Sequence, residues 1–335
     1  MAEKKVTMQM VANRLGISKS TVSKAISNYG GISEKTRKKV LDAMKEMDFH
    51  PNSMARNLAN DVSKNIGLIL PNGNDDFFIS PFFQNCLRGM SETAGDRGYD
   101  LLIIYNCNDA CKAVDMAIKE RKVDGIILLR STLNNPIVKY LKQKNFPFVL
   151  IGKSLDFKDI NTVDTDNIKA SYDLTERLIK KGCKEIAFIG GNKDSVVTID
   201  RKKGYYKALK NNNLSYKENM AIESDFTSSS GYFSMKDIMA KYPDTDGVIV
   251  TDEIMFIGVA NYISEYEGLN KKVIAGIFGN GLLEIENPLY KSKIDVIKLD
   301  INSNDIGSLS CNKIIDIIEN KEVQRESYIR YDISK

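Results

Sequence analysis

The sequence predicts an α/β protein with a small helical head and a body of two parallel sheets. From residue 65 onward, short apolar runs of strand length alternate with amphipathic stretches of helix length. This alternation is typical of parallel sheets covered by helices on both faces. The first 60 residues carry helical patterns and hold eleven Lys and Arg against five Asp and Glu, a balance of +6, which leaves −2 for the rest. A basic head on a near-neutral body favours a nucleic-acid-binding module joined to a second function.

Composition excludes several classes of protein. The 335 residues suffice for two or three domains, and no run of eighteen apolar residues or N-terminal signal peptide is present, so we expect a cytoplasmic protein without a membrane partner. The only histidine, His50, lies in the head, so the body cannot build a Ser-His-Asp triad or a His-ligated metal site. Cys107 and Cys111 have no second pair at zinc spacing, and no glycine-rich phosphate loop occurs. We therefore expect no metal, no cofactor and no enzyme activity.

Three short helices are predicted in the head. Thr7 can cap the first, whose apolar face includes Ala12, and Gly16 ends it. Ser18 can cap the second, and Ser33 the third. A small residue where two helices cross, followed four positions later by a glycine in the turn, is the helix-turn-helix pattern.

The second helix presents a polar face that suits the major groove of DNA, where such side chains contact base edges and phosphates. A helical hairpin with no DNA role is the alternative. The candidate DNA contacts of the head are Thr7, Ser18, Lys19, Ser20, Thr21, Ser23 and Lys24.

Residues 6–60 resemble the DNA-binding head of the lactose-repressor/galactose-repressor (LacI/GalR) family of bacterial transcription regulators. The resemblance rests on VTMQMVANRLGISKSTVSKAI and on ISEKTRKKVLDAMKEMDFHPNSMARNLA. It implies a DNA-binding domain over residues 1–50, a hinge helix and linker over 51–62, and a two-lobed, periplasmic-binding-protein-like body over 63–335 that binds an effector and forms a homodimer.

The same resemblance implies that the hinge orders on operator DNA against the dimer mate. Its candidate DNA contacts are Asn52, Ala55 and Leu58. Leu58 falls where the family inserts an apolar wedge into the minor groove, which unstacks one base step and kinks the duplex. An ordinary linker contact is the alternative for Leu58.

In the body we expect eight strands, which are too few for a barrel with eight complete helices and suit two smaller sheets. They cover residues 66–70, 101–105, 125–129, 148–151, 186–189, 247–250, 273–278 and 296–299. The clearest helical stretches cover residues 82–97, 167–181, 201–210 and 302–319. Ligands of open α/β sheets bind outside the carboxyl ends of the strands.

The loop after the first strand places aromatic side chains among polar ones, a combination that suits a sugar. Phe77, Phe78 and Phe82 are the effector candidates there. Packing at the lobe interface or at a dimer contact is the alternative for Phe82 and its neighbour Phe83.

Three further effector candidates follow from the resemblance. Arg201 lies in an Arg-xx-Gly-aromatic motif whose arginine grips sugar hydroxyls in the family, and Asp252 lies in the family's acidic turn. A structural salt bridge between these two residues is the alternative. Asn280 ends a turn that reads Ile277-Phe278-Gly279-Asn280, in which the family's carboxylate is lost.

Together these features predict a homodimeric repressor that binds a pseudo-palindromic operator and is switched by a sugar between the lobes. NIGLILPNG and NCLRGMSETAGDRGYDLLI, with GISKSTVSKAI, resemble regulators of maltose and maltodextrin uptake. Leucine heptads are absent from the C-terminal residues, so we expect dimers and not tetramers. The other hypotheses are a solute-binding or sugar-active protein with an incidental head, and a catabolite regulator that uses a phosphoprotein corepressor.

Overall fold

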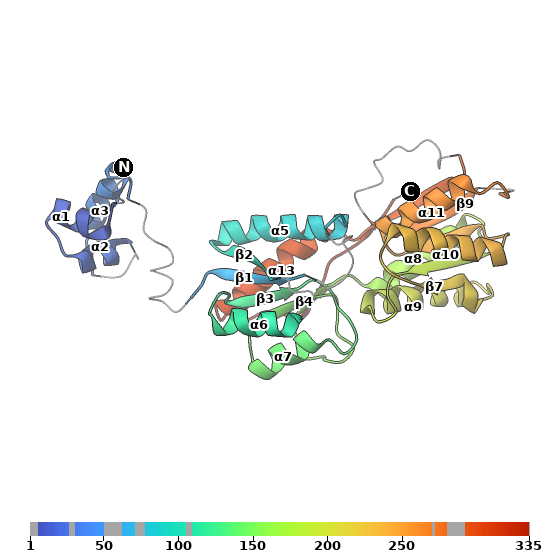
Figure 1. Cartoon of the computed structure of the whole chain (residues 1–335), viewed down its shortest axis with the longest axis horizontal. Coiled ribbons are helices and arrows are strands. Elements are labelled where there is room, and N and C mark those ends of the chain that lie inside the picture. The colour runs from blue at the N-terminus through green and yellow to red at the C-terminus, as the bar shows by residue number, and fades with distance from the viewer. Residues whose placement is uncertain are drawn as a thin grey trace. The chain divides into compact units, whose positions relative to one another are not determined.

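The computed structural model describes residues 6–26, 31–49, 62–70, 78–104, 109–269, 272–279 and 292–334 (Figure 1). The chain forms two compact units, Met1–Ser63 and Lys64–Lys335. We call them the head and the body. The expected hinge residues Asn52, Ala55 and Leu58 lie outside the described residues, as do Phe77 and Asn280.

The described part of the head contains three short helices, α1 (Met8–Leu15), α2 (Lys19–Ile26) and α3 (Glu34–Glu46). The Thr7 side chain accepts a hydrogen bond from the Met10 amide and caps α1, while Ser33 caps α3 in the same way. Gly16 ends α1 with φ of +63°, a conformation that costs glycine little. The caps and the turn are those expected from the sequence.

One apolar cluster holds the three helices of the head together. Its buried members are Val11, Ala12, Val22, Ala25, Val40, Ala43 and Phe49. Together with the partly buried members of the cluster they recur at three- and four-residue spacing, so each helix turns one face inward and leaves its polar face in solvent. These partly buried residues include Met8, Leu15, Ile26, Met44 and Met47.

The body consists of two lobes, each with a six-stranded sheet. The first sheet has the order β11-β5-β4-β3-β1-β2, and all its pairs are parallel. Its strands are β1 (Asn65–Ile69), β2 (Asp100–Ile104), β3 (Gly125–Leu128), β4 (Phe148–Ile151), β5 (Thr162–Asp164) and β11 (Glu326–Tyr328). Its helices are α5 (Pro81–Arg97), α6 (Ala110–Lys119), α7 (Pro136–Lys144) and α13 (Ser303–Ile318).

The second sheet has the order β12-β10-β9-β8-β6-β7, and only its β10–β12 pair is antiparallel. Its strands are β6 (Ile186–Gly190), β7 (Ala221–Glu223), β8 (Gly247–Val250), β9 (Val273–Phe278), β10 (Ile294–Asp300) and β12 (Asp332–Ile333). Its helices are α8 (Asn167–Lys180), α9 (Val196–Asn211), α10 (Ser228–Lys241), α11 (Glu253–Glu265) and the short 3-10 helix η2 (Glu218–Met220).

The chain passes between the lobes three times, after β5, after β10 and after β11. As a result α13, red in Figure 1, packs against α5 and the first sheet although it comes from the far end of the sequence. Three connecting segments of this kind leave the lobes free to change their relative orientation as rigid bodies.

Each sheet is apolar on both faces. In β3, Ile127 packs into the cluster beneath α5 and α13, while Ile126 and Leu128 face the cluster beneath α6 and α7. A strand covered on both faces needs a continuous apolar run, which is the pattern seen in the sequence. The expected α/β class, with two sheets and a helical head, is confirmed. Among the described residues no helix is both long and apolar enough to cross a bilayer.

Candidate functional site

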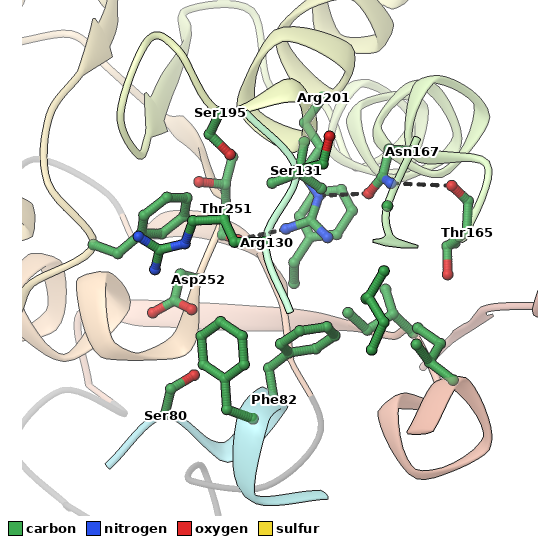
Figure 2. Close-up of a pocket in the computed structure, with 18 of the residues that line it drawn as sticks. Ser80, Phe82, Arg130, Ser131, Thr165, Asn167, Ser195, Arg201, Thr251 and Asp252 are labelled. Carbon is green, nitrogen blue, oxygen red and sulfur yellow. Dashed lines mark hydrogen bonds between the residues drawn. The ribbon is translucent and has the colours of Figure 1, made fainter. Parts of the chain in front are cut away.

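A cavity of about 130 Å³ lies where the carboxyl ends of both sheets meet, roughly tenfold the space one water molecule needs. The loops after β3, β4 and β5 line it from the first lobe, and those after β6, β8 and β9 from the second. This is the edge at which the ends of parallel strands bring ligand-binding side chains together. Figure 2 shows 18 of the lining residues.

Arg201 of α9 is the most firmly held side chain in the cavity. It is buried, its Nε donates to Asn167 Oδ1 at 2.9 Å, and its Nη1 donates to the Thr251 carbonyl at 2.6 Å (Figure 2). The ring of Phe278 lies 3.8 Å from the guanidinium carbon. Burial lowers the pKa of Arg201 to about 10, so the guanidinium stays charged at neutral pH. These contacts fix the orientation of the cation before any ligand binds.

Asp252 precedes α11 and caps its N-terminus with its carboxylate. Its Oδ1 accepts hydrogen bonds from the amides of Ile254 at 2.8 Å and Met255 at 3.4 Å. Burial raises the pKa of Asp252 to about 6, although these amides oppose the shift. Arg201 and Asp252 make no direct ion pair within the described chain, so the salt bridge considered as an alternative is not formed. Asp252 therefore keeps acceptor capacity for a ligand.

A second buried acid, Asp164 at the end of β5, faces the same cavity. Its Oδ1 accepts from the Thr165 amide at 2.8 Å and from Asn167 Nδ2 at 2.9 Å. Burial raises the pKa of Asp164 to about 7. Asn167 thus connects this acid to Arg201, since its amide donates to one and accepts from the other.

Arg130, just beyond β3, lines the cavity but was not predicted from the sequence as a site residue. Its guanidinium carbon lies 5.9 Å from the ring centre of Phe83 and 5.4 Å from that of Phe226. Burial lowers the pKa of Arg130, while the charge of Asp252 opposes that shift. Because Phe83 belongs to the first lobe and Phe226 to the second, this cation lies between aromatic rings of both lobes. The rule that ligands bind at strand ends could have found it, since Leu129 ends a predicted strand.

Two hydroxyl groups of cavity-lining residues lack a partner. Thr165 Oγ1 and Thr251 Oγ1 are buried, and neither makes a hydrogen bond within the described part of the chain. Both oxygens are fully buried and are not exposed to the cavity, so they are unsatisfied buried polar atoms of a kind that is rare in proteins, and not contacts for a ligand in this conformation.

The aromatic candidates separate into two groups. Phe82 and Phe83 begin α5 and line the cavity together with Phe226 and Phe278. Phe78 is 61% exposed and is not among the lining residues, because the chain turns before α5 begins at Pro81. The structure therefore gives no support to an effector contact by Phe78.

Six of the seven candidate DNA contacts of the head lie on α2 or at Ser18 just before it, while Thr7 caps α1. Ser18 Oγ accepts from the Thr21 amide at 3.0 Å and lies within hydrogen-bond distance of the Ser20 and Thr21 hydroxyls. The exposed side chains on this helix are Lys19, Ser20, Ser23 and Lys24, and Thr21 is half-buried. A helix that presents exposed hydroxyls and ammonium groups matches the chemistry of a phosphate backbone and base edges.

A chain with a helix-turn-helix head and a cavity between two α/β lobes belongs to the class of ligand-responsive DNA-binding regulators. Two family models divide it accordingly. Bacterial regulatory proteins of the lacI family match residues 7–52, and the periplasmic binding proteins and sugar binding domain of the LacI family match residues 63–335. The chain belongs to the LacI family. It is a DNA-binding repressor and not an enzyme.

Individual relatives support the assignment of this chain to the LacI family. The transcriptional regulator MalR of Streptococcus pneumoniae is 37% identical over 324 residues, which cover 96% of this chain and 95% of that protein. A LacI-type regulator of Bacillus cereus subsp. cytotoxis has a solved structure with TM-score 0.76 and 32% identity, covering 82% of this chain and 97% of that one. The maltose operon repressor MalR of Staphylococcus aureus superposes with TM-score 0.72 and 27% identity, again covering 82% and 97%.

Proposed function

We propose that this repressor binds a pseudo-palindromic operator as a homodimer and is switched by maltose or a related oligosaccharide held between its lobes. The observation that carries the proposal is the cavity, where the fixed guanidinium of Arg201 lies with the Asp252 carboxylate and with the aromatic rings of the lining. Donors, acceptors and aromatic faces in one cavity match the hydroxyl edges and C–H faces of a sugar. The similarity to MalR proteins supports the maltose class.

The proposed domain division places DNA binding in residues 1–50, a hinge in 51–62, and effector binding and dimerisation in 63–335. The polar face of α2 supports the first assignment, with Lys19, Ser20 and Lys24 entering the major groove. We place Asn52, Ala55 and Leu58 of the hinge at the minor groove by family resemblance. A DNA-binding regulator acts where the DNA is, so we propose a cytoplasmic location.

The proposed switch is a change in lobe orientation. A sugar that contacts both lobes favours the orientation in which the cavity walls are correctly spaced. Three segments of the described chain connect the lobes, so this reorientation can alter how two hinge segments are presented to DNA. To change operator occupancy tenfold, the sugar must bind one orientation better by about 1.4 kcal/mol.

The first experiment is calorimetry of the full chain with maltose, maltotriose, glucose and glucose 6-phosphate. We expect binding of maltose or maltotriose and none of the phosphorylated sugar, because two of the cations that line the cavity already have partners. Arg201 donates to Asn167 and Thr251, and Lys153 pairs with Asp200. Binding of glucose 6-phosphate alone would contradict the proposal.

We predict that Arg201→Ala abolishes the sugar response while leaving DNA affinity within about twofold. The substitution removes a buried donor from the cavity but leaves the head unchanged. Affinity is measured by fluorescence anisotropy on an operator fragment selected from a random DNA pool, with and without maltose. Arg177→Ala is the control, since Arg177 is exposed on α8 and does not line the cavity. A normal maltose response in Arg201→Ala would refute the sugar assignment.

A further inference from the structure

Two loops from opposite lobes pair with one another at the rim of the cavity. The Leu133 amide donates to the Asp194 carbonyl at 2.9 Å, and the Val196 amide donates to the Ser131 carbonyl at 3.2 Å. Between them, Thr132 and Ser195 form an isolated antiparallel bridge. Figure 2 shows Ser131 and Ser195 on the same side of the cavity. A short piece of β-pairing therefore joins the loop after β3 to the loop after β6.

An ion pair spans the lobes beside this pairing. Lys153, at the end of β4 in the first lobe, pairs through its Nζ with Asp200 Oδ2 on α9 of the second lobe. The Asp200 side chain is only 2% exposed, whereas that of Lys153 is 30% exposed. Asp200 Oδ1 has no hydrogen bond within the described chain, and Lys203 Nζ lies 3.8 Å away. A buried carboxylate loses much if its cation leaves, so this pair favours the lobe orientation in which it forms.

The two loops of the first lobe that carry these contacts, one after β3 and one after β4, are also joined to each other. Gly152 has φ of +93°, and a Cβ at that position would lie 2.9 Å from the Ser131 Cβ. A glycine here lets the two loops approach closely enough for the Ser131 hydroxyl to donate to the Lys153 carbonyl. The backbone pairing and the ion pair are therefore held as one unit on the first lobe.

We propose that these contacts form an inter-lobe clasp, in which Lys153 and Asp200 act as positioning residues that favour the lobe orientation able to bind ligand. The proposal rests on the proposed function in one respect, because it makes lobe orientation the quantity that a ligand changes. The clasp accounts for a buried carboxylate on α9 that does not line the cavity. Through Asp200, which lies outside the cavity wall, the clasp influences cavity affinity, since part of the cost of aligning the lobes is met before a ligand arrives.

Hydrogen exchange of the full chain, with no sugar or DNA present, tests the clasp directly. The amides of Leu133 and Val196 are protected by carbonyls of the opposite lobe, so their exchange reports the clasped population. We expect Lys153→Met to accelerate exchange in peptides covering 131–135 and 192–197 by tenfold or more. The core strands β3 and β6 should keep wild-type rates. Lys153→Arg should restore protection, because it retains the cation.

Two further variants separate the clasp from general folding. Val196 is the first residue of α9, where proline is well tolerated, and Ser195 before it already has an extended ψ of 121°. Val196→Pro should therefore remove the inter-lobe donor with little effect on the helix and accelerate exchange at Leu133. Lys203→Met is the matched control, because Lys203 is 55% exposed and approaches the same carboxylate without crossing the lobes. It should leave exchange unchanged.

The clasp is refuted if exchange at Leu133 and Val196 in Lys153→Met stays within twofold of wild type, or if Lys203→Met accelerates it equally. A ligand assay gives an independent outcome. If maltose binds the wild-type chain, Asp200→Asn should weaken that binding about tenfold although Asp200 does not line the cavity. Should maltose not bind at all, the proposed function fails while the exchange result still decides the clasp.

Discussion

The carboxyl group of Asp164 is buried beside Asn167 and Arg201, and this position makes the body sensitive to pH. Burial raises the pKa of Asp164 to about 7 from an ordinary value of 3.8. The folded body therefore holds a proton between about pH 4 and pH 7 that the unfolded chain has released. The free energy of unfolding should fall as pH rises through this window, because folding then confines a carboxylate that water would solvate.

We predict that Asp164→Asn removes most of the fall in the free energy of unfolding between about pH 4 and pH 7. Asparagine keeps an oxygen that can accept from the Thr165 amide and Asn167, but it has no charge to desolvate. Urea unfolding followed by circular dichroism should show the variant more stable than wild type at pH 8, by up to about 4 kcal/mol, and nearly equal to it at pH 4. The control is Asp295→Asn, at a side chain that is 57% exposed. A wild-type pH profile in Asp164→Asn would contradict the assignment.

At the scale of single residues, the sequence predicted those site residues that lie in a short local motif. Arg201 and Asp252 were found because each lies in a short motif whose neighbours in the chain are also its neighbours in space. Arg130 has no such motif, and its partners Phe83 and Phe226 come from α5 and from the segment before α10. The sequence indicates that the turn Ile277-Phe278-Gly279-Asn280 lacks the carboxylate that the family has there. Only the structure shows that the ring of Phe278 stacks on Arg201.

At the scale of elements, the helices of each lobe approach closely through glycines. A Cβ on Gly89 of α5 would lie 2.1 Å from the Asn304 carbonyl oxygen of α13, and one on Gly307 would lie 2.1 Å from that of Cys86. A backbone oxygen cannot move aside as a side chain can. The pairing of α5 with α13 therefore depends on these two glycines, and it holds a helix from the end of the chain against the first lobe.

We predict opposite effects for two substitutions on α5. Gly89→Ala should lower the free energy of unfolding by about 3 kcal/mol, because the added methyl group separates α5 from α13. Gly95→Ala should raise it by about 0.5–1 kcal/mol, because a Cβ there meets nothing within 4 Å and alanine favours the helix. Urea unfolding of both variants tests the pair. Equal changes would show that helix propensity, and not the contact with α13, determines the effect.

Strands were predicted where the chain is apolar for four residues or more, and all eight such strands form. Among the described residues, the strands that were missed are β5, β7, β11 and β12, which have only two or three residues each. Three of them, β5, β11 and β12, adjoin the segments that pass between the lobes. These short strands pair with strands that are distant in the sequence, and the local sequence carries no signal of such pairing.

At the scale of the whole molecule, the first lobe presents an apolar edge that suits a second copy of the chain. β2 is an edge strand of its sheet, and its Ile103 is 50% exposed. Leu87 of α5 and Met116 of α6, in the same lobe, are 39% and 47% exposed. Exposed apolar side chains around an uncovered strand edge are typical of an interface. The proposed dimer would bring two heads to two half-sites of one operator.

We predict that Ile103→Asp converts the dimer into a monomer, because it introduces a charge that dimerisation would have to desolvate. Sedimentation equilibrium at micromolar concentration should give twice the mass of the chain for wild type and its single mass for the variant. Operator affinity should fall by at least a hundredfold, since one head then reads one half-site, while maltose binding persists. Tyr328→Asp is the control, since Tyr328 is 56% exposed on β11 at the opposite edge of the same sheet. A dimeric Ile103→Asp protein would show that the interface does not include Ile103. A monomeric wild type would refute the dimer.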